Sequence, residues 1–282
     1  MPYNAQISRT NPACILLLVD QSKSMADPIA GAAGQSKAVV VADAVNRLIQ
    51  NLVLRSAKAG GVRDYFHVGL IGYGREVRSG LGGNILSRPL VPISQLSDTP
   101  LRIESRTRLT PDGAGGVIEK TIKFPVWYEP QAGGPTPMCS AFDVAAETVR
   151  VFTETYPAAF PPVVLNLTDG EPTDGDPAGK AWLIRMIEPN DGNALLFNIL
   201  LTAAPIPPTY FPANEDQLVD EYARALFKMS SVLPPKLFEA ARAEGFAIKD
   251  GARGVVINAD PTALVRFLDI GTRVSPPGGA GG

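Results

Sequence analysis

Two segments of this chain have the character of buried strands and lead into a carboxylate, and this arrangement constrains the fold more than any other feature. Residues 15–19 form a continuous apolar run that is followed by Asp20. Residues 163–167 form the second expected strand, and Asp169 lies shortly beyond it. An unbroken apolar run is typical of a strand that is covered on both faces. Because sites in parallel sheets lie at the carboxyl ends of the strands, both carboxylates are expected at one edge of the sheet.

Apolar residues at helical spacing separate the expected strands. The clearest helix is predicted over residues 38–57, where they form one stripe. Further helices are expected over residues 140–151, 177–187, 215–229 and 261–270, and further strands over residues 66–73, 194–201 and 255–258. Strands that alternate with helices predict the α/β class, with a Rossmann-like, doubly wound, mostly parallel central sheet and helices on both faces.

The segment over residues 80–134 departs from this alternation. Short β-like runs at residues 101–109 and 116–124 flank an Asp-Gly turn, which predicts a β-hairpin insertion. Four charged residues at even positions of the first run would share one face: Arg102, Glu104, Arg106 and Arg108. We interpret this row as a solvated face that protects a strand edge, with a docking surface for an acidic partner as the alternative.

Oxygen-bearing side chains follow the first strand at alternate positions. Asp20, Ser22 and Ser24 can converge from one side of a loop, because side chains alternate along an extended segment. A site made only of oxygen suits Mg²⁺ rather than zinc. Two later segments offer matching chemistry, since Thr136 lies in a Gly-Pro turn and Asp169 follows the second strand. The competing interpretation is that these polar residues only cap helices and turns.

The order of these motifs resembles a known family. Asp-x-Ser-x-Ser, a distant Thr and a Thr-Asp-Gly after a strand are similar to the metal-ion-dependent adhesion site of von Willebrand factor type A domains. The five matching positions are Asp20, Ser22, Ser24, Thr136 and Asp169. The resemblance implies that these residues bind Mg²⁺, with Mn²⁺ or Ca²⁺ as alternatives. The chain resembles the intracellular bacterial type of this family, such as the tellurite-resistance, TerY-like proteins.

The domain organisation expected from these features is simple. Residues 1–12 are an N-terminal extension, and residues 13–272 are one von Willebrand factor A domain that carries the insertion at 80–134. Residues 273–282 form a Gly/Pro tail that is expected to be disordered.

The expected function follows from the number of ligands. Two carboxylates and three hydroxyls are few groups for an ion that takes six oxygens, so water completes the shell and one position stays open for a partner's Asp or Glu. The resemblance implies a protein-interaction module in a bacterial stress-response, signalling or phage-defence assembly, with an AAA+ ATPase, a kinase or phosphatase, or a defence-complex subunit as partner. Two alternatives stay open: a metal-dependent phosphohydrolase, and a structural assembly subunit whose metal only stiffens the loops.

Enzymatic chemistry finds less support in the sequence, and we expect no catalytic residue. Ser22 stands where phosphatases of the haloacid dehalogenase type need a second carboxylate. The single histidine, His67, is interpreted as structural, and no Gly-x-x-x-x-Gly-Lys-[Ser/Thr] loop is present in the sequence. Cys139, near the start of a predicted helix, would gain thiolate character there but lacks an oriented base.

Charge and the first residues bear on partners and location. The net charge of -2 gives no electrostatic reason to expect nucleic acid or an anionic membrane as partner. Residues 1–10 lack the apolar core of a signal peptide, and residues 13–19 are too short to span a bilayer, so a cytoplasmic protein is expected. Cys14 and Cys139 are expected to be buried and unpaired.

Overall fold

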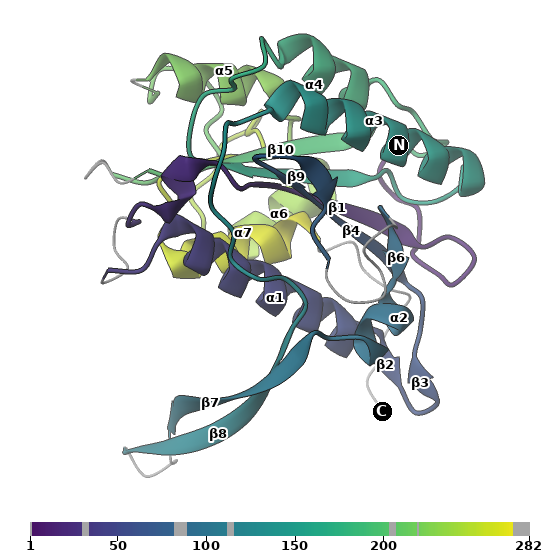
Figure 1. Ribbon diagram of the computed structural model, residues 1–282. Coiled ribbons are helices and arrows are strands. Elements are labelled where there is room, and N and C mark those ends of the chain that lie inside the picture. The colour runs from purple at the N-terminus through teal and green to yellow at the C-terminus, as the bar shows by residue number, and fades with distance from the viewer. Residues whose placement is uncertain are drawn as a thin grey trace.

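The main sheet is mixed but mostly parallel. The computed structural model describes residues 2–29, 34–81, 89–111, 116–202, 207–218 and 220–272. The strands run in the order β11-β12-β10-β9-β1-β4-β5, and β6 also pairs with β4 (Figure 1). The parallel strands are β1 (Ala13–Asp20), β4 (Phe66–Tyr73), β9 (Val163–Thr168), β10 (Leu195–Leu200) and β12 (Val255–Ile257). This arrangement confirms the α/β class predicted from the sequence.

Helices cover both faces of this sheet (Figure 1). One face carries α1 (Lys37–Ser56), α6 (Pro235–Ala243) and α7 (Pro261–Gly271), and the other carries α3 (Met138–Thr155), α4 (Ala178–Arg185) and α5 (Glu221–Met229). In β1, Leu17 packs in the core on the α1 side, whereas Leu16 and Leu18 pack in the core on the α3 side. The continuous apolar run in the sequence is therefore explained by two separate cores.

Short strands form the edges of the sheet. The outer side of β4 is shared by the antiparallel strands β5 (Val77–Ser79) and β6 (Val91–Pro92), and the opposite edge is β11 (Thr209–Tyr210). The remaining small elements are η1 (Lys23–Ala26), β2 (Ala57–Lys58), β3 (Gly61–Val62) and α2 (Ile93–Asp98). No helix among the described residues is long and apolar enough to cross a membrane.

The inserted hairpin is confirmed and forms a small sheet of its own. Strands β7 (Arg102–Pro111) and β8 (Val117–Val126) pair antiparallel and project away from the body, beyond α1 (Figure 1). Asn46 of α1 anchors its base: its Oδ1 accepts hydrogen bonds from the backbone N–H groups of Trp127 (2.8 Å) and Tyr128 (3.0 Å). Its Nδ2 donates to the carbonyl of Tyr128 at 2.8 Å. The hairpin is thus fixed to the helix at one end.

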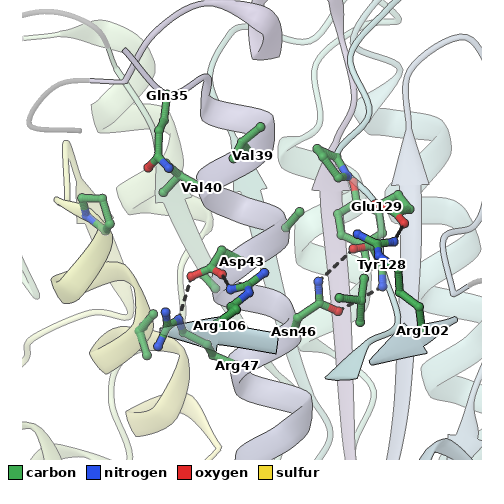
Figure 2. A pocket seen from close by; sticks show the side chains of 16 residues that line it. Gln35, Val39, Val40, Asp43, Asn46, Arg47, Arg102, Arg106, Tyr128 and Glu129 are labelled. Atoms are coloured by element: carbon green, nitrogen blue, oxygen red, sulfur yellow. Dashed lines mark hydrogen bonds and ion pairs between the residues drawn. The ribbon is translucent and has the colours of Figure 1, made fainter. Parts of the chain in front are cut away.

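The charged row of the hairpin is largely paired. Arg106 forms an ion pair with Asp43 of α1, and Arg102 pairs with Glu129 (Figure 2). Both arginines also pair with Glu104. Arg106 also stacks on the ring of Phe124, with its guanidinium carbon 3.5 Å from the ring centroid. The side chain of Arg108 lies outside the described part of the chain. Internal partners therefore already neutralise much of the positive charge that an acidic ligand would need.

Several expected element boundaries were wrong. The helix expected over residues 215–229 begins only at Glu221, because the carboxylate of Asp220 caps its first turn through the N–H groups of Tyr222 and Ala223. The helices α2 and α6 were not predicted, since both are short and carry few buried apolar residues. The tail at residues 273–282 and part of the hairpin turn lie outside the described residues.

The N-terminal segment before β1 is bonded to the rest of the protein. Both carboxylate oxygens of Asp191 accept backbone hydrogen bonds from it, from Asn4 at 3.0 Å and from Ala5 at 2.7 Å. Ile7 is fully buried and joins the core on the α1 side. The segment before the first strand therefore contributes to packing.

Candidate metal site at the carboxyl edge of the sheet

The chain changes direction in the sheet between β1 and β9. From β1 it crosses to β4 on one side, whereas β9, β10 and β12 follow in order on the other side. Asp20 ends β1, and Asp169 directly follows β9, which pairs with β1 in parallel. In open α/β sheets such a switch point forms a crevice at the carboxyl ends of the strands. The fold therefore brings both carboxylates to the crevice, as the sequence predicts.

Hydrogen bonds join four of the predicted site residues. The hydroxyl of Ser24 donates to Asp169 Oδ1 at 2.8 Å, and the hydroxyl of Ser22 lies 3.4 Å from the same oxygen. The two hydroxyls are 3.0 Å apart. The backbone N–H of Ser22 donates to Asp20 Oδ1 at 2.8 Å, which folds the loop back over the end of β1. Asp20, Ser22, Ser24 and Asp169 thus gather at one place.

Thr136 lies in the adjoining loop. Gly133 N–H donates to the carbonyl of Gln21 at 2.7 Å, and Lys23 N–H donates to the carbonyl of Gly134 at 3.0 Å, so the two loops are bonded side by side. Thr136 itself is buried, and its backbone N–H donates to the hydroxyl of Thr173 at 3.0 Å. Within the described chain, however, its own hydroxyl forms no hydrogen bond to the other four residues of the predicted site.

Two glycines permit this close approach of loops. A Cβ on Gly74 would lie 2.7 Å from the carbonyl oxygen of Gln21 and 2.9 Å from that of Gly133. Gly134 has φ +93, and a Cβ there would lie 2.6 Å from the backbone nitrogen of Arg75. Because these clashes are with backbone atoms, side-chain movement cannot relieve them. Glycine at these two positions therefore lets the loops of the site approach each other closely.

A buried polar chain lies beneath the site. Tyr73 Oη donates to Asn166 Oδ1 at 2.8 Å, Asn166 donates to Asn198 Oδ1 at 2.9 Å, and Asn198 donates to Ser230 Oγ at 2.9 Å. All four side chains are fully buried. Since buried polar groups are costly unless they are bonded, this chain fixes the relative positions of β4, β9 and β10. It explains why a polar residue occurs inside the otherwise apolar strand β9.

The structure brings two further residues to the site, Thr168 and Lys37. Thr168 Oγ1 donates to Asp20 Oδ2 at 2.9 Å. Lys37 Nζ, from the first turn of α1, lies 2.7 Å from Asp169 Oδ2. Thr168 was visible in the sequence as part of Thr-Asp-Gly. Lys37 lies one residue before the predicted helix. The sequence offered one indication of its role: a cation at the start of a helix is unusual, because acidic residues are preferred there.

Electrostatics at the site favour a cation. Burial raises the pKa of Asp20 to about 6, the hydrogen bonds from Ser22 oppose this rise, and the negative charge of Asp169 adds to it. A bound divalent ion would act in the opposite direction and stabilise both ionised carboxylates.

The donor set fits a hard cation rather than a soft one. All the gathered side-chain atoms are carboxylate or hydroxyl oxygens, apart from the ammonium of Lys37. Among the residues that the structure describes, no group of three or more His, Cys, Asp or Glu side chains is placed to hold a metal. Besides Asp20 and Asp169, any metal here would therefore need hydroxyl groups and water as further ligands, which is compatible with Mg²⁺.

Comparison with known proteins gives matches only among solved structures. Neither a scan against protein-family models nor a search of curated proteins found a match. A von Willebrand factor type A protein from Catenulispora acidiphila is similar over 94% of this chain and 43% of its own, at 14% identity and a TM-score of 0.47.

Two pilus proteins give comparable values. The adhesin SpaC from Lactobacillus rhamnosus GG matches over 96% of this chain and 32% of its own, at 15% identity and a TM-score of 0.49. The minor pilin PilB from Streptococcus sanguinis matches over 98% of this chain and 63% of its own, at 11% identity and a TM-score of 0.48. The chain thus spans less than two thirds of each of these solved chains.

Proposed function

We propose that this protein is a Mg²⁺-dependent protein-interaction module. Asp20, Ser22, Ser24, Thr136 and Asp169 would hold the ion, directly or through water, and a carboxylate from a partner protein would complete its coordination. The bound ion would supply a positive charge at the crevice that attracts this carboxylate. The observation that carries the proposal is the hydrogen-bonded cluster of two carboxylates and two serine hydroxyls at the switch point of the sheet.

The setting of this module belongs to the same proposal. We propose a cytoplasmic protein of a bacterial stress-response, signalling or defence assembly, whose partner is an AAA+ ATPase, a kinase or phosphatase, or a defence-complex subunit. This setting rests on the resemblance of the motifs to intracellular von Willebrand factor A domains. Mn²⁺ or Ca²⁺ in place of Mg²⁺ would leave the docking mechanism unchanged, since both are bound by oxygen ligands.

A phosphohydrolase is less well supported. In the register of β1 and β4, His67 pairs with Cys14, whereas Asp20 pairs with Tyr73 at the other end of both strands. The separation along the strand is about 20 Å at the usual rise per residue. His67 instead packs edge-on against Phe152 of α3, and burial lowers its pKa. The single histidine of the chain is therefore remote from the proposed metal.

The first experiment measures whether the site binds Mg²⁺. Addition of Mg²⁺ to the chelator-treated protein should raise its thermal stability, by about 2.7 kcal/mol at a free concentration one hundred times Kd. Asp20→Asn should abolish this gain. Asp143→Asn, which removes an exposed carboxylate of α3 paired with Lys180, is the matched control and should keep it. An equal response in both variants would place the ion elsewhere and contradict the proposed site.

The second experiment tests docking. Proteins captured from a bacterial lysate by the wild-type chain in Mg²⁺ should be lost in EDTA and lost with Asp20→Asn. Substitution of single Asp or Glu residues in the captured protein should then identify the carboxylate that reaches the metal. If Mg²⁺ stabilises the chain but captures are identical in Mg²⁺ and EDTA, the metal is structural. If the chain hydrolyses a simple phosphate ester with Mg²⁺, and Asp20→Asn abolishes that turnover, the enzyme alternative holds.

A further inference from the structure

Lys37 is the one cation bonded to the candidate site among the residues described. Its Nζ lies 2.7 Å from Asp169 Oδ2, and the two side chains are 6% and 0% exposed. Nζ also lies within 3.4 Å of the backbone carbonyl of Ser24, so the ammonium sits between the two loops that carry the site. Asp169 Oδ1 is bonded by the serine hydroxyls and Oδ2 by the ammonium. Both oxygens of this carboxylate are therefore occupied within the protein.

The position of Lys37 is not explained by the stability of its helix. It is the first residue of α1, where the helix dipole is positive and disfavours a cation. Burial of an ammonium is also costly, and a buried ion pair seldom repays this cost compared with apolar packing. The backbone fixes the residue here nonetheless, because Lys37 N–H donates to the carbonyl of Asp27 at 3.0 Å. The geometry thus places a costly charge directly against a proposed metal ligand.

We propose that Lys37 is a built-in competitor of the metal ion. In the metal-free protein its ammonium neutralises Asp169 and holds the site closed; a divalent ion gains Asp169 only when Lys37 leaves it. The site would then alternate between a lysine-bound and a metal-bound state, and the exchange would set a threshold of metal concentration for docking. This inference rests on the proposed function, since it describes the regulation of the same site.

The test compares two lysines that differ in their contacts. Lys37→Met removes the ammonium but keeps a chain of similar length. Lys23→Met removes an exposed charge from the same loop region without touching Asp169, and is the matched control. Calorimetric titration with Mg²⁺ alone should show binding about tenfold or more tighter for Lys37→Met than for wild type, and a change below about threefold for Lys23→Met. In EDTA, Lys37→Met should melt at a lower temperature than wild type, because the charge of Asp169 is then buried without a counter-ion. Addition of Mg²⁺ should restore the melting temperature.

A measurement on the wild-type chain covers the case in which Lys37→Met does not fold. Reductive methylation of lysines, read by mass spectrometry, should label Lys37 faster in saturating Mg²⁺ than in EDTA. Lys58, which is exposed in β2, should be labelled equally in both and serves as the internal reference.

The outcomes separate this inference from the proposed function. Equal Mg²⁺ affinity in wild type and Lys37→Met, or unchanged labelling of Lys37 in saturating Mg²⁺, overturns the competitor role and leaves the metal-dependent module intact. Equal gains in Lys37→Met and Lys23→Met mean that general surface charge, and not the contact with Asp169, controls binding, which also overturns it. An absence of Mg²⁺ binding in all three proteins overturns both proposals together.

Discussion

The thiol of Cys139 lies in the first turn of α3, a position that favours a thiolate. Asp174 changes this, because its carboxylate accepts hydrogen bonds from the N–H groups of Cys139 at 3.0 Å and Ser140 at 2.9 Å. Burial, together with the negative charge of Asp174, raises the pKa of Cys139 to about 11. The helix start is thus used to hold a carboxylate, and the sulfur beside it stays protonated.

Alkylation of Cys139 tests this. A thiol whose pKa is raised to about 11 is almost wholly protonated at pH 8, so its reaction with iodoacetamide should be slow there and should rise about tenfold per pH unit up to pH 10. Asp174→Asn should lower the pKa and speed the reaction at pH 8. Labelling is read on the Cys139 peptide by mass spectrometry, which separates it from any labelling of Cys14, the other free cysteine. A rate that levels off below pH 9 in the wild-type protein would contradict the prediction.

At this scale the sequence predicted which oxygen-bearing side chains lie together better than it predicted what they contact. Asp20 ends a strand, Ser22 and Ser24 follow in the next loop, and Asp169 directly follows another strand; the end of a strand can be predicted from the hydrophobic pattern. The contact between Lys37 and Asp169 joins residues 132 positions apart, and no local pattern encodes it. Single side chains that meet across the crevice therefore required the three-dimensional structure.

Asn46 shows how one element holds another. Its side chain bonds two backbone donors and one backbone acceptor at the base of the hairpin, as a neighbouring strand would do. Figure 2 shows Asn46 beside Tyr128. In the described part of the chain, the hairpin strands form no backbone pairing with the main sheet. The side-chain amide of Asn46 therefore supplies hydrogen bonds that a neighbouring strand would otherwise supply. The helix α1 therefore serves as the support of the insertion as well as a cover for the core.

Replacement of Asn46 should destabilise the protein strongly. Asn46→Leu has a similar volume but leaves the N–H groups of Trp127 and Tyr128 and the carbonyl of Tyr128 without partners, at a cost of about 3 kcal/mol or more. Asn51→Leu, on the same helix at a half-buried position, is the control and should change stability by less than about 0.5 kcal/mol. The free energies of unfolding come from urea titration. Equal effects of the two substitutions would show that the amide bonds carry no special weight.

The elements that the sequence predicted well share a clear hydrophobic period. The strand expected over residues 66–73 matches β4 at both ends, and the expected inserted hairpin is present. The two helices that were not predicted are α2 and α6, which span 6 and 9 residues and bury few side chains. Such short helices depend on tertiary contacts for their stability, and sequence periodicity cannot detect them reliably over so few turns.

The molecule consists of a layered body, formed by the main sheet and its helices, and a projecting arm, the hairpin of β7 and β8 (Figure 1). The body contains the switch point and the candidate metal site, whereas the outer part of β7 and β8 extends beyond α1. Arg106 and Ile122 are directly paired across the hairpin. A new turn that joins these two residues would therefore shorten the hairpin without changing the pairing of the remaining strand residues.

A shortened variant tests this separation. Replacement of residues 107–121 by Asn-Gly, a favoured two-residue turn, keeps the ion pair of Arg106 with Asp43 and the hydrogen bonds of Asn46 to the base of the hairpin. The variant should keep the melting temperature of the wild type within a few degrees and should respond to Mg²⁺ as the wild type does. Circular dichroism and a thermal scan measure this. A loss of cooperative melting would show that the arm is part of the folding unit.

The edges of the two sheets have a consequence for how other chains can attach. In the main sheet the edge strands β5, β6 and β11 span only 3, 2 and 2 residues, so an incoming strand finds few backbone groups to pair with. In the hairpin, β7 and β8 each span 10 residues and pair only with each other among the residues described. Strand addition by a foreign peptide would therefore extend the arm, while the exposed Lys120 and Lys123 of β8 oppose the stacking of one copy on another.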